Sequence, residues 1–200
     1  MKIIKTKLVP PSLNIFAVGC ILSILLGVFF HFFYNLSGNA FLIGLFFPVN
    51  ESIWEHLKLV LVPITIFALV YSLLIYKKQK HMLNNFWYYL SNCIIISMII
   101  IPISHYTYKT IFKTVPDFVN ILIYIISIII SFYYLYKKIS MEYIYPSSKN
   151  KNSTGILTIT ILYLVFIIFT IYPPKLELFR DPITDTFGIY LLQYKCIYKK

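Results

Sequence analysis

Residues 48–58 read PVNESIWEHLK and lead directly into the apolar run LVLVPITIFALVYSLLIY at residues 59–76. Ionisable side chains so close to a hydrophobic segment are costly in a bilayer and usually have a function. Ser52 and Glu55 have the spacing of a capping box, and Pro48 just upstream suits the start of a helix. The stretch therefore predicts a membrane helix that begins near Ser52 with a cluster of polar side chains at its start.

The composition of the chain is too apolar for a soluble domain. Of its 200 residues, 59% are hydrophobic and only 12% are charged, whereas soluble domains are about half apolar and roughly 25% charged. The charges lie in short clusters between long apolar runs, so we predict a single integral membrane domain over residues 1–200, embedded in a lipid bilayer. The net charge of +11 does not indicate nucleic-acid binding, because the lysines lie at the ends of apolar runs, where they meet lipid headgroups.

Long apolar runs of this kind can cross a hydrocarbon core about 30 Å thick. They predict an all-α fold, a polytopic membrane bundle with five transmembrane helices at residues 13–34, 52–76, 86–104, 118–136 and 156–172. Residues 40–47 are apolar but too short to span, which predicts a re-entrant or interfacial segment. Residues 147–154 resemble a flexible linker, and the tail at 173–200 carries a short apolar patch at 187–198. The sequence leaves open whether 40–47 and 187–198 enter the bilayer.

The distribution of lysines predicts the orientation of the bundle. The segment before the first helix, the turn after the second and the loop after the fourth carry ten of them, against two in the opposite loops before the tail. The ten are Lys2, Lys5, Lys7, Lys77, Lys78, Lys80, Lys137, Lys138, Lys149 and Lys151, and the two are Lys109 and Lys113. Because cytoplasmic loops are enriched in basic residues, we expect a cell-membrane protein with its N-terminus in the cytoplasm and its C-terminus outside.

This orientation gathers most acidic and imidazole groups at the outer face. His31 ends the first span, Glu51 and His56 flank the start of the second, and Asp181 follows the fifth. Imidazole and carboxylate groups are typical ligands of zinc or another divalent ion, which can activate a bound water for hydrolysis. We therefore take His31, Glu51 and His56 as candidate metal ligands. Adjacent Glu55 and His56 point about 100° apart on a helix and do not suit one ion, whereas Glu51 with Glu55, or Ser52 with His56, share a face.

A structural interpretation of the same residues stays open. Glu55 can be the reciprocal partner of a Ser52 cap, and Lys58, three residues further on, can form an intrahelical ion pair with it. His31 taken alone suits a packed, hydrogen-bonded histidine. The chain contains no HExxH motif, no glycine-rich phosphate loop and no CxxC, so it does not establish that the protein is an enzyme.

Three motifs together resemble a known family. They are His31-x-x-Tyr34 with Ser37-Gly38, the stretch PVNESIWEHLK, and Asp181-Pro182-x-Thr184-x-Thr186-Phe187-Gly188. In these the chain is similar to a family of bacterial multi-pass membrane proteins, domain-of-unknown-function family 6512, which has no assigned activity. The resemblance spans nearly the whole chain, although relatives carry Glu-Trp in place of Asn35-Leu36 and Gly in place of Asp185. It implies that the signature positions form a site; they are His31, Asn50, Glu51, Ser52, Glu55, His56, Lys58 and Asp181.

Three hypotheses for function follow. The first is an outward-facing polar pocket that binds a metal ion or a lipid headgroup, with intramembrane hydrolysis as its furthest extension. The second is a non-catalytic transport or partner-binding protein, and the third gives the motif a purely structural role. The sequence identifies neither the ligand nor the oligomeric state.

Overall fold

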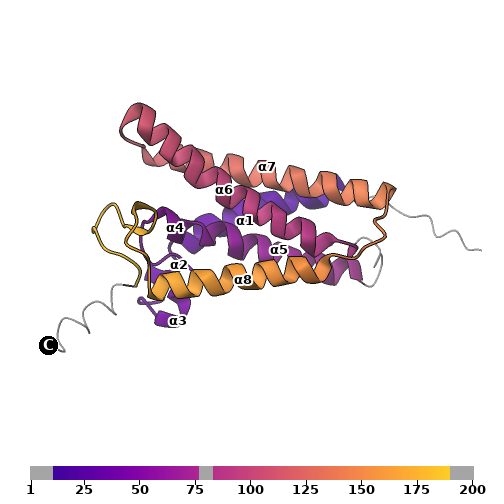
Figure 1. Cartoon of the computed structure of the whole chain (residues 1–200), viewed down its shortest axis with the longest axis horizontal. Coiled ribbons are helices and arrows are strands. Elements are labelled where there is room, and N and C mark those ends of the chain that lie inside the picture. The colour runs from indigo at the N-terminus through magenta and orange to yellow at the C-terminus, as the bar shows by residue number, and fades with distance from the viewer. Residues whose placement is uncertain (1–10, 77–82, 190–200) are drawn as a thin grey trace, which may run out of the picture.

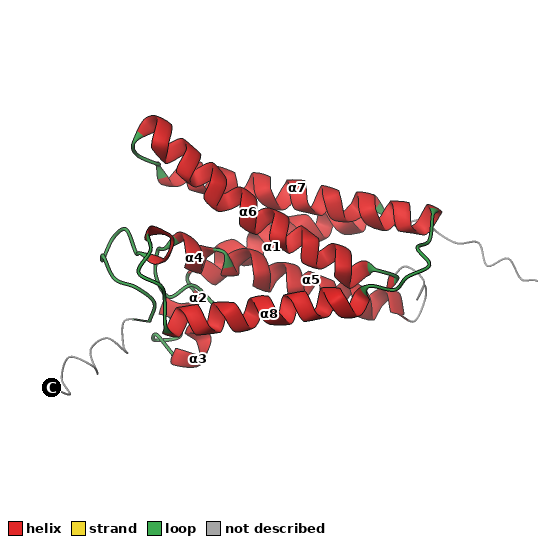
Figure 2. Ribbon diagram, in the orientation of Figure 1, coloured by secondary structure: helices red, strands yellow, loops and turns green. Residues whose placement is uncertain are grey.

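The computed structural model describes residues 11–76 and 83–189, and this part of the chain consists of helices joined by loops (Figures 1 and 2). Five of its helices are long and apolar enough to cross a membrane. The predicted all-α fold with five such helices is therefore confirmed. Within the described residues, extended pairing is limited to an isolated bridge between Arg180 and Phe187.

The long helices are α1 (Leu13–His31), α5 (Lys58–Tyr76), α6 (Phe86–Phe112), α7 (Asp117–Ile144) and α8 (Asn152–Ile171). One-turn helices α2 (Phe33–Leu36), α3 (Phe41–Gly44) and α4 (Ile53–His56) connect α1 to α5, and a 3-10 turn η2 (Glu177–Phe179) follows α8. Helix α3 lies in the apolar segment predicted to be too short to span. Helices α6 and α7 run well beyond the predicted spans, because the polar residues after their apolar cores are also tolerated in helices.

The bundle is held by close packing of small and aromatic residues. Helix α6 packs along α7 and α8, and α1 packs along α5 and α7. The hydroxyl of Ser97 in α6 donates to Ser131 Oγ in α7 at 2.7 Å, and both side chains are buried. The Tyr124 hydroxyl of α7 lies 3.3 Å from the carbonyl oxygens of Ser23 in α1 and Leu59 in α5. Small and hydroxyl-bearing residues at helix contacts are typical of membrane bundles, where lipid removes the hydrophobic drive between helices.

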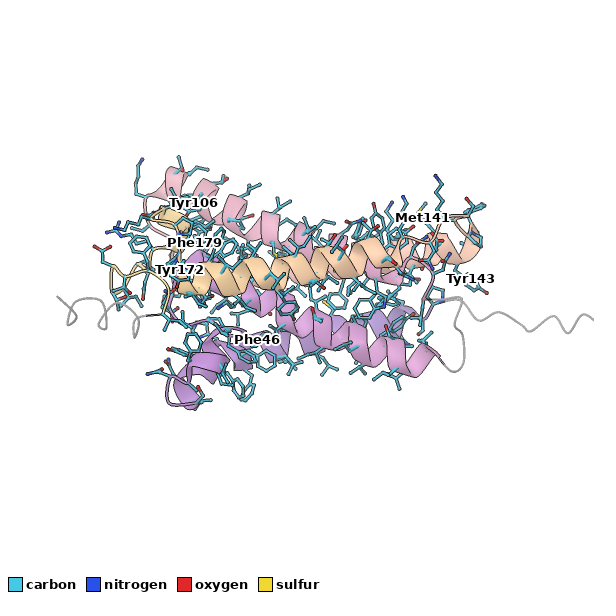
Figure 3. The ribbon with its side chains drawn as sticks, turned by 60° about the horizontal axis from the view of Figure 1, so that its bottom comes forward. Phe46, Tyr106, Met141, Tyr143, Tyr172 and Phe179 are labelled. Carbon is cyan, nitrogen blue, oxygen red and sulfur yellow. The ribbon has the colours of Figure 1, made fainter. Side chains whose placement is uncertain are left out.

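The outward faces of the long helices are apolar. Leu25, Leu73 and Ile103 each leave more than half of their surface exposed, as suits side chains that contact lipid tails. Aromatic side chains lie toward both ends of the bundle, with Tyr172 and Phe179 labelled at one end and Tyr143 at the other (Figure 3). Aromatic belts of this kind mark the boundaries of a membrane.

A buried carboxylate organises one end of the bundle. Glu142, near the end of α7, accepts hydrogen bonds from the Asn84 and Asn85 side chains, from the Tyr89 hydroxyl and from the Ser147 backbone N–H at 2.8–3.0 Å. We call these five residues the Glu142 cluster. Asn85 also holds the backbone of the loop that follows, since its side chain bonds to Lys149 O and Lys151 N. The segment 147–154 predicted as a flexible linker is thus partly helical, because α8 already begins at Asn152, and Asn85 bonds the backbone of the part before it.

The opposite end carries the polar residues of the central motif, and we call it the site end. There α2, α3 and α4 meet the last turn of α8 and the loop that follows it (Figure 1). His31 ends α1 at the site end, so α1 begins at the end of the Glu142 cluster. The apolar patch predicted at 187–198 lies, beyond Ile189, outside the described residues, as do the lysines at 2–7 and 77–80 that predicted the orientation.

Candidate metal centre

Two imidazoles and one carboxylate converge at the site end. The Nε2 atoms of His31 and His56 are 3.1 Å apart. Glu51 Oε2 lies 3.4 Å from the first and 3.3 Å from the second. The three residues, which we call the triad, therefore present one ligand atom each within the space that a single ion would fill. The structure brings together the three residues taken as candidate metal ligands.

Local structure explains how two of these side chains meet. Ser52 caps α4, since its hydroxyl accepts the Glu55 backbone N–H at 3.3 Å. Glu51 precedes this cap and is outside the helix, which lets its carboxylate turn toward His56 on α4. The carbonyl oxygen of Ser52 lies 2.8 Å from His56 Nδ1. A carbonyl can only accept, so Nδ1 donates, and in the neutral ring the lone pair then lies on Nε2, toward the centre of the triad.

Helix α4 is fixed in place by an aromatic contact. Trp54 stacks on Phe166 of α8 with ring centroids 4.4 Å apart, and lies 4.7 Å from the ring of Phe179 in η2. Helix α1, which ends at His31, packs along α5 and α7. Stacked aromatic pairs add stability beyond the area they bury. The two histidines are thus presented from helices whose positions are set by packing.

The triad is open to its surroundings and carries a fixed charge. The side chains of His31, His56 and Glu51 are 30%, 29% and 40% exposed, so a ligand can reach them. The adjacent His31 ring, and then the His56 ring, lower the pKa of the Glu51 carboxyl well below its ordinary value. Glu51 is therefore a carboxylate at neutral pH. The Nδ1 atom of His31 is buried without a hydrogen-bond partner.

Glu55 and Lys58 form a separate, buried ion pair. Their side chains are 2% and 1% exposed, and Lys58 Nζ lies 2.6 Å from Glu55 Oε2. Lys58 also donates to the carbonyl oxygens of Gly44 at 2.8 Å and Phe47 at 3.4 Å. The second oxygen of Glu55 accepts from the Thr170 hydroxyl of α8 at 2.9 Å. The ion pair between Glu55 and Lys58 considered from the sequence is present, but it joins α4 to the first residue of α5 and does not lie within one helix.

Asn50 and Asp181 belong to a third group, formed with the loop after α8. Asn50 donates to Gly188 O at 3.3 Å and accepts the Ser52 N–H at 3.0 Å. Asp181 accepts the Ile183 N–H and the Thr184 hydroxyl, which closes a turn of its own loop. Together they line a pocket of about 190 Å³ with Val49, Thr184, Thr186 and Gly188.

The eight residues predicted as one pocket therefore divide among three structures. His31, Glu51 and His56 converge, and the Ser52 carbonyl orients the His56 ring. Glu55 and Lys58 pair in the interior, and Asn50 with Asp181 contacts the C-terminal loop. The expected face shared by Glu51 and Glu55 does not form, because Glu51 lies before the helix cap. Thr170 was missed by the sequence analysis, since a threonine at the end of an apolar helix carries no signal of a contact with Glu55.

Comparison with known proteins identifies a family for the chain but no activity. A family model described as "Family of unknown function (DUF6512)" matches residues 5–189. This match confirms the resemblance drawn from the three motifs. Neither the curated proteins nor the solved structures contain a match to the chain.

Proposed function

Since the chain belongs to DUF6512, a family of unknown function, its role has to be argued from its own residues, and we propose that it is a membrane metal-binding protein. His31, Glu51 and His56 would hold one divalent cation such as Zn²⁺ at the outer side of the cell membrane. The observation that carries this proposal is the size of the triangle formed by the three ligand atoms. A position left open on the ion would take water or a lipid headgroup oxygen.

The distances suit a tetrahedral ion. With zinc–nitrogen bonds of about 2.0–2.1 Å, neighbouring ligands of a tetrahedron lie roughly 3.3–3.4 Å apart. The three distances in the triad are 3.1, 3.4 and 3.3 Å. An octahedral ion with bonds of about 2.1 Å would bring neighbouring ligands to roughly 3.0 Å. The triangle is thus closer to one face of a tetrahedron.

The second interaction of His56 supports the same interpretation. Metal-bound histidines usually donate their other ring nitrogen to a carbonyl or carboxylate, which fixes the tautomer. His56 Nδ1 does this with Ser52 O at 2.8 Å. An ion of charge +2 with two neutral imidazoles and one carboxylate retains a net charge of +1. It would therefore favour an electron-rich oxygen as its next ligand.

Three protein ligands with an open position are typical of catalytic zinc, whereas structural zinc usually has four. The exposure of the triad side chains, between 29% and 40%, leaves room for such a fourth ligand. Intramembrane hydrolysis at a lipid headgroup is the activity that this arrangement would permit. The chain's own contribution would be to bind the ion, to orient the imidazoles and to supply the Glu51 carboxylate.

Elemental analysis of the detergent-purified protein tests the proposal. We expect about one equivalent of a divalent metal in the wild type, and its loss in both Glu51→Gln and His56→Ala. Glu177→Gln is the matched control, because Glu177 is an exposed carboxylate at the site end whose partners are Lys109 and Arg180. Wild-type protein that binds no metal after incubation with Zn²⁺ and dialysis would refute the proposal.

The same variants distinguish the two rival functions. A transport or partner-binding role predicts no retained metal and unchanged melting in both triad variants. A purely structural motif predicts no metal and a large loss of thermal stability in both. The metal-binding proposal alone predicts that the variants differ from the wild type mainly when metal is present.

A further inference from the structure

We infer that Glu55, Lys58 and Thr170 form a buried framework that positions the metal triad. The inference rests on the proposed metal site and assigns a role to residues that do not contact the ion. None of the three lies within the triangle of ligand atoms. Lys58 and Glu55 instead bind the chain before Glu51, and Thr170 binds Glu55.

Lys58 fixes the segment that leads to Glu51. Its ammonium, 1% exposed, donates to Gly44 O at 2.8 Å and Phe47 O at 3.4 Å. These carbonyls belong to the end of α3 and the turn after it, a few residues before Glu51. A lysine is almost never buried this fully unless it is paired, and here each of its three N–H groups has an acceptor: two carbonyls and the carboxylate of Glu55.

Glu55 extends the framework to the residues nearest the triad. Its Oε2 accepts the Val49 N–H at 3.2 Å as well as the Lys58 ammonium. Val49 lies two residues before Glu51, and Glu55 itself immediately precedes His56. The Glu55 carboxylate therefore connects the segment before Glu51 to α4, the helix that carries His56. A change in its position would move Glu51 and His56 relative to each other.

Thr170 connects this carboxylate to α8. Its buried hydroxyl lies 2.9 Å from Glu55 Oε1 and 2.8 Å from the carbonyl of Phe166, one turn earlier in the same helix. Nearby, the Ile189 N–H donates to Thr170 O at 3.1 Å. Thr170 thus joins Glu55 to helix α8, in addition to the Trp54–Phe166 and Asn50–Gly188 contacts. A tetrahedral site tolerates little displacement of its ligands, so an anchor of this kind would raise its affinity for the ion.

Thr170→Val tests the inference with little change in shape. Zn²⁺ affinity would be measured by competition with a chromogenic chelator, and the geometry of the site by the visible absorption of the Co²⁺-loaded protein. We expect Thr170→Val to weaken Zn²⁺ binding by up to roughly 10-fold, the lower end of the effect of losing a group bonded directly to a ligand, because Thr170 acts through Glu55. The Co²⁺ bands should also change in position or intensity.

Two control variants separate positioning from general stability. Thr170→Ser keeps the hydroxyl and should restore wild-type affinity. Thr160→Val removes a hydroxyl from the same helix that bonds only to Ile156 O, so its affinity should also be that of the wild type. Because Thr170→Val leaves the buried Oε1 of Glu55 without its donor, it should also lower metal-free melting, so the affinities are compared at a temperature well below the melting point of every variant.

The possible results distinguish a failure of this positioning role from a failure of the proposed metal site. If the wild type binds Zn²⁺ and both Thr170→Val and a folded Lys58→Met bind it equally well, the inference is wrong and the metal site stands. If the wild type binds no Zn²⁺, both are wrong. A loss of affinity in Thr170→Val that Thr170→Ser does not repair would also overturn the inference, since the hydroxyl would then not be the cause.

Discussion

Glu51→Gln should separate the stability of the fold from the stability gained on binding metal. Glu51 is 40% exposed, and its ion-pair contacts are those with His31 and His56. Exposed ion pairs contribute at most about 1 kcal/mol, so in a chelator the variant should lose no more than this. In Zn²⁺ at about 100 times its Kd, the wild type should gain about 2.7 kcal/mol, because the ion binds the folded state alone. Glu51→Gln should gain almost none of this.

Thermal unfolding in detergent measures both effects. For a chain of this size, about 1 kcal/mol corresponds to a shift in Tm of roughly 2–4 °C. The wild type should therefore rise by about 5–10 °C with Zn²⁺ relative to chelator, and the Glu177→Gln control should rise equally. Glu51→Gln should differ from the wild type by at most about 4 °C in chelator and should not respond to Zn²⁺. A full response in Glu51→Gln would refute the assignment of Glu51 as a ligand.

Three further predictions address the fold, pH and topology. Glu142→Ala should lower the free energy of unfolding by roughly 3 kcal/mol, because it leaves the donors of the Glu142 cluster unpaired, whereas Glu142→Gln should lose clearly less; equal melting of both would contradict the cluster's role. The lowered pKa of Glu51 means that its carboxylate stabilises the folded state above the ordinary value of 4.5 and loses that effect as pH falls through the folded pKa. In chelator, a difference in Tm between the wild type and Glu51→Gln should therefore still be present at pH 5 and vanish only in stronger acid, and a difference that disappears near pH 6 would contradict this. In a Cys196→Ser background, a membrane-impermeant maleimide should label Asp185→Cys in intact cells but not Asn150→Cys, and the reverse pattern would invert the proposed orientation.

The fold was predictable because lipid imposes a simple rule on sequence. Each spanning helix needs about 20 apolar residues, and the five runs in this chain stand out against short charged clusters. The helix ends were less predictable. Helix α6 continues to Phe112 through Tyr106, Tyr108 and Lys109, since polar residues do not stop a helix once it leaves the hydrocarbon core. Pro116, the N-cap of α7, instead marks where the next helix starts.

The site was predictable in composition but not in arrangement. The choice of His31, Glu51 and His56 followed from chemistry, since these are the ligand types gathered near one end of two spans. The supporting contacts could not be inferred in this way. Glu55 meets Thr170 across 115 positions of sequence, and the Asn50 amide meets Gly188 across 138. Contacts at such separations depend on how the helices pack, which a single sequence does not reveal.

The structural interpretation of the motif accounts for only half of it. Ser52 as a cap and Glu55 with Lys58 as a buried pair explain why these three residues are needed for a helix start. They do not explain why His31, His56 and Glu51 bring Nε2, Nε2 and Oε2 together at one point. Two neutral histidines facing each other at 3.1 Å share at most one hydrogen bond. A cation at the centre of the triangle would use both lone pairs and the carboxylate charge together, and on that physical ground we favour a metal site over a capped and salt-bridged helix start.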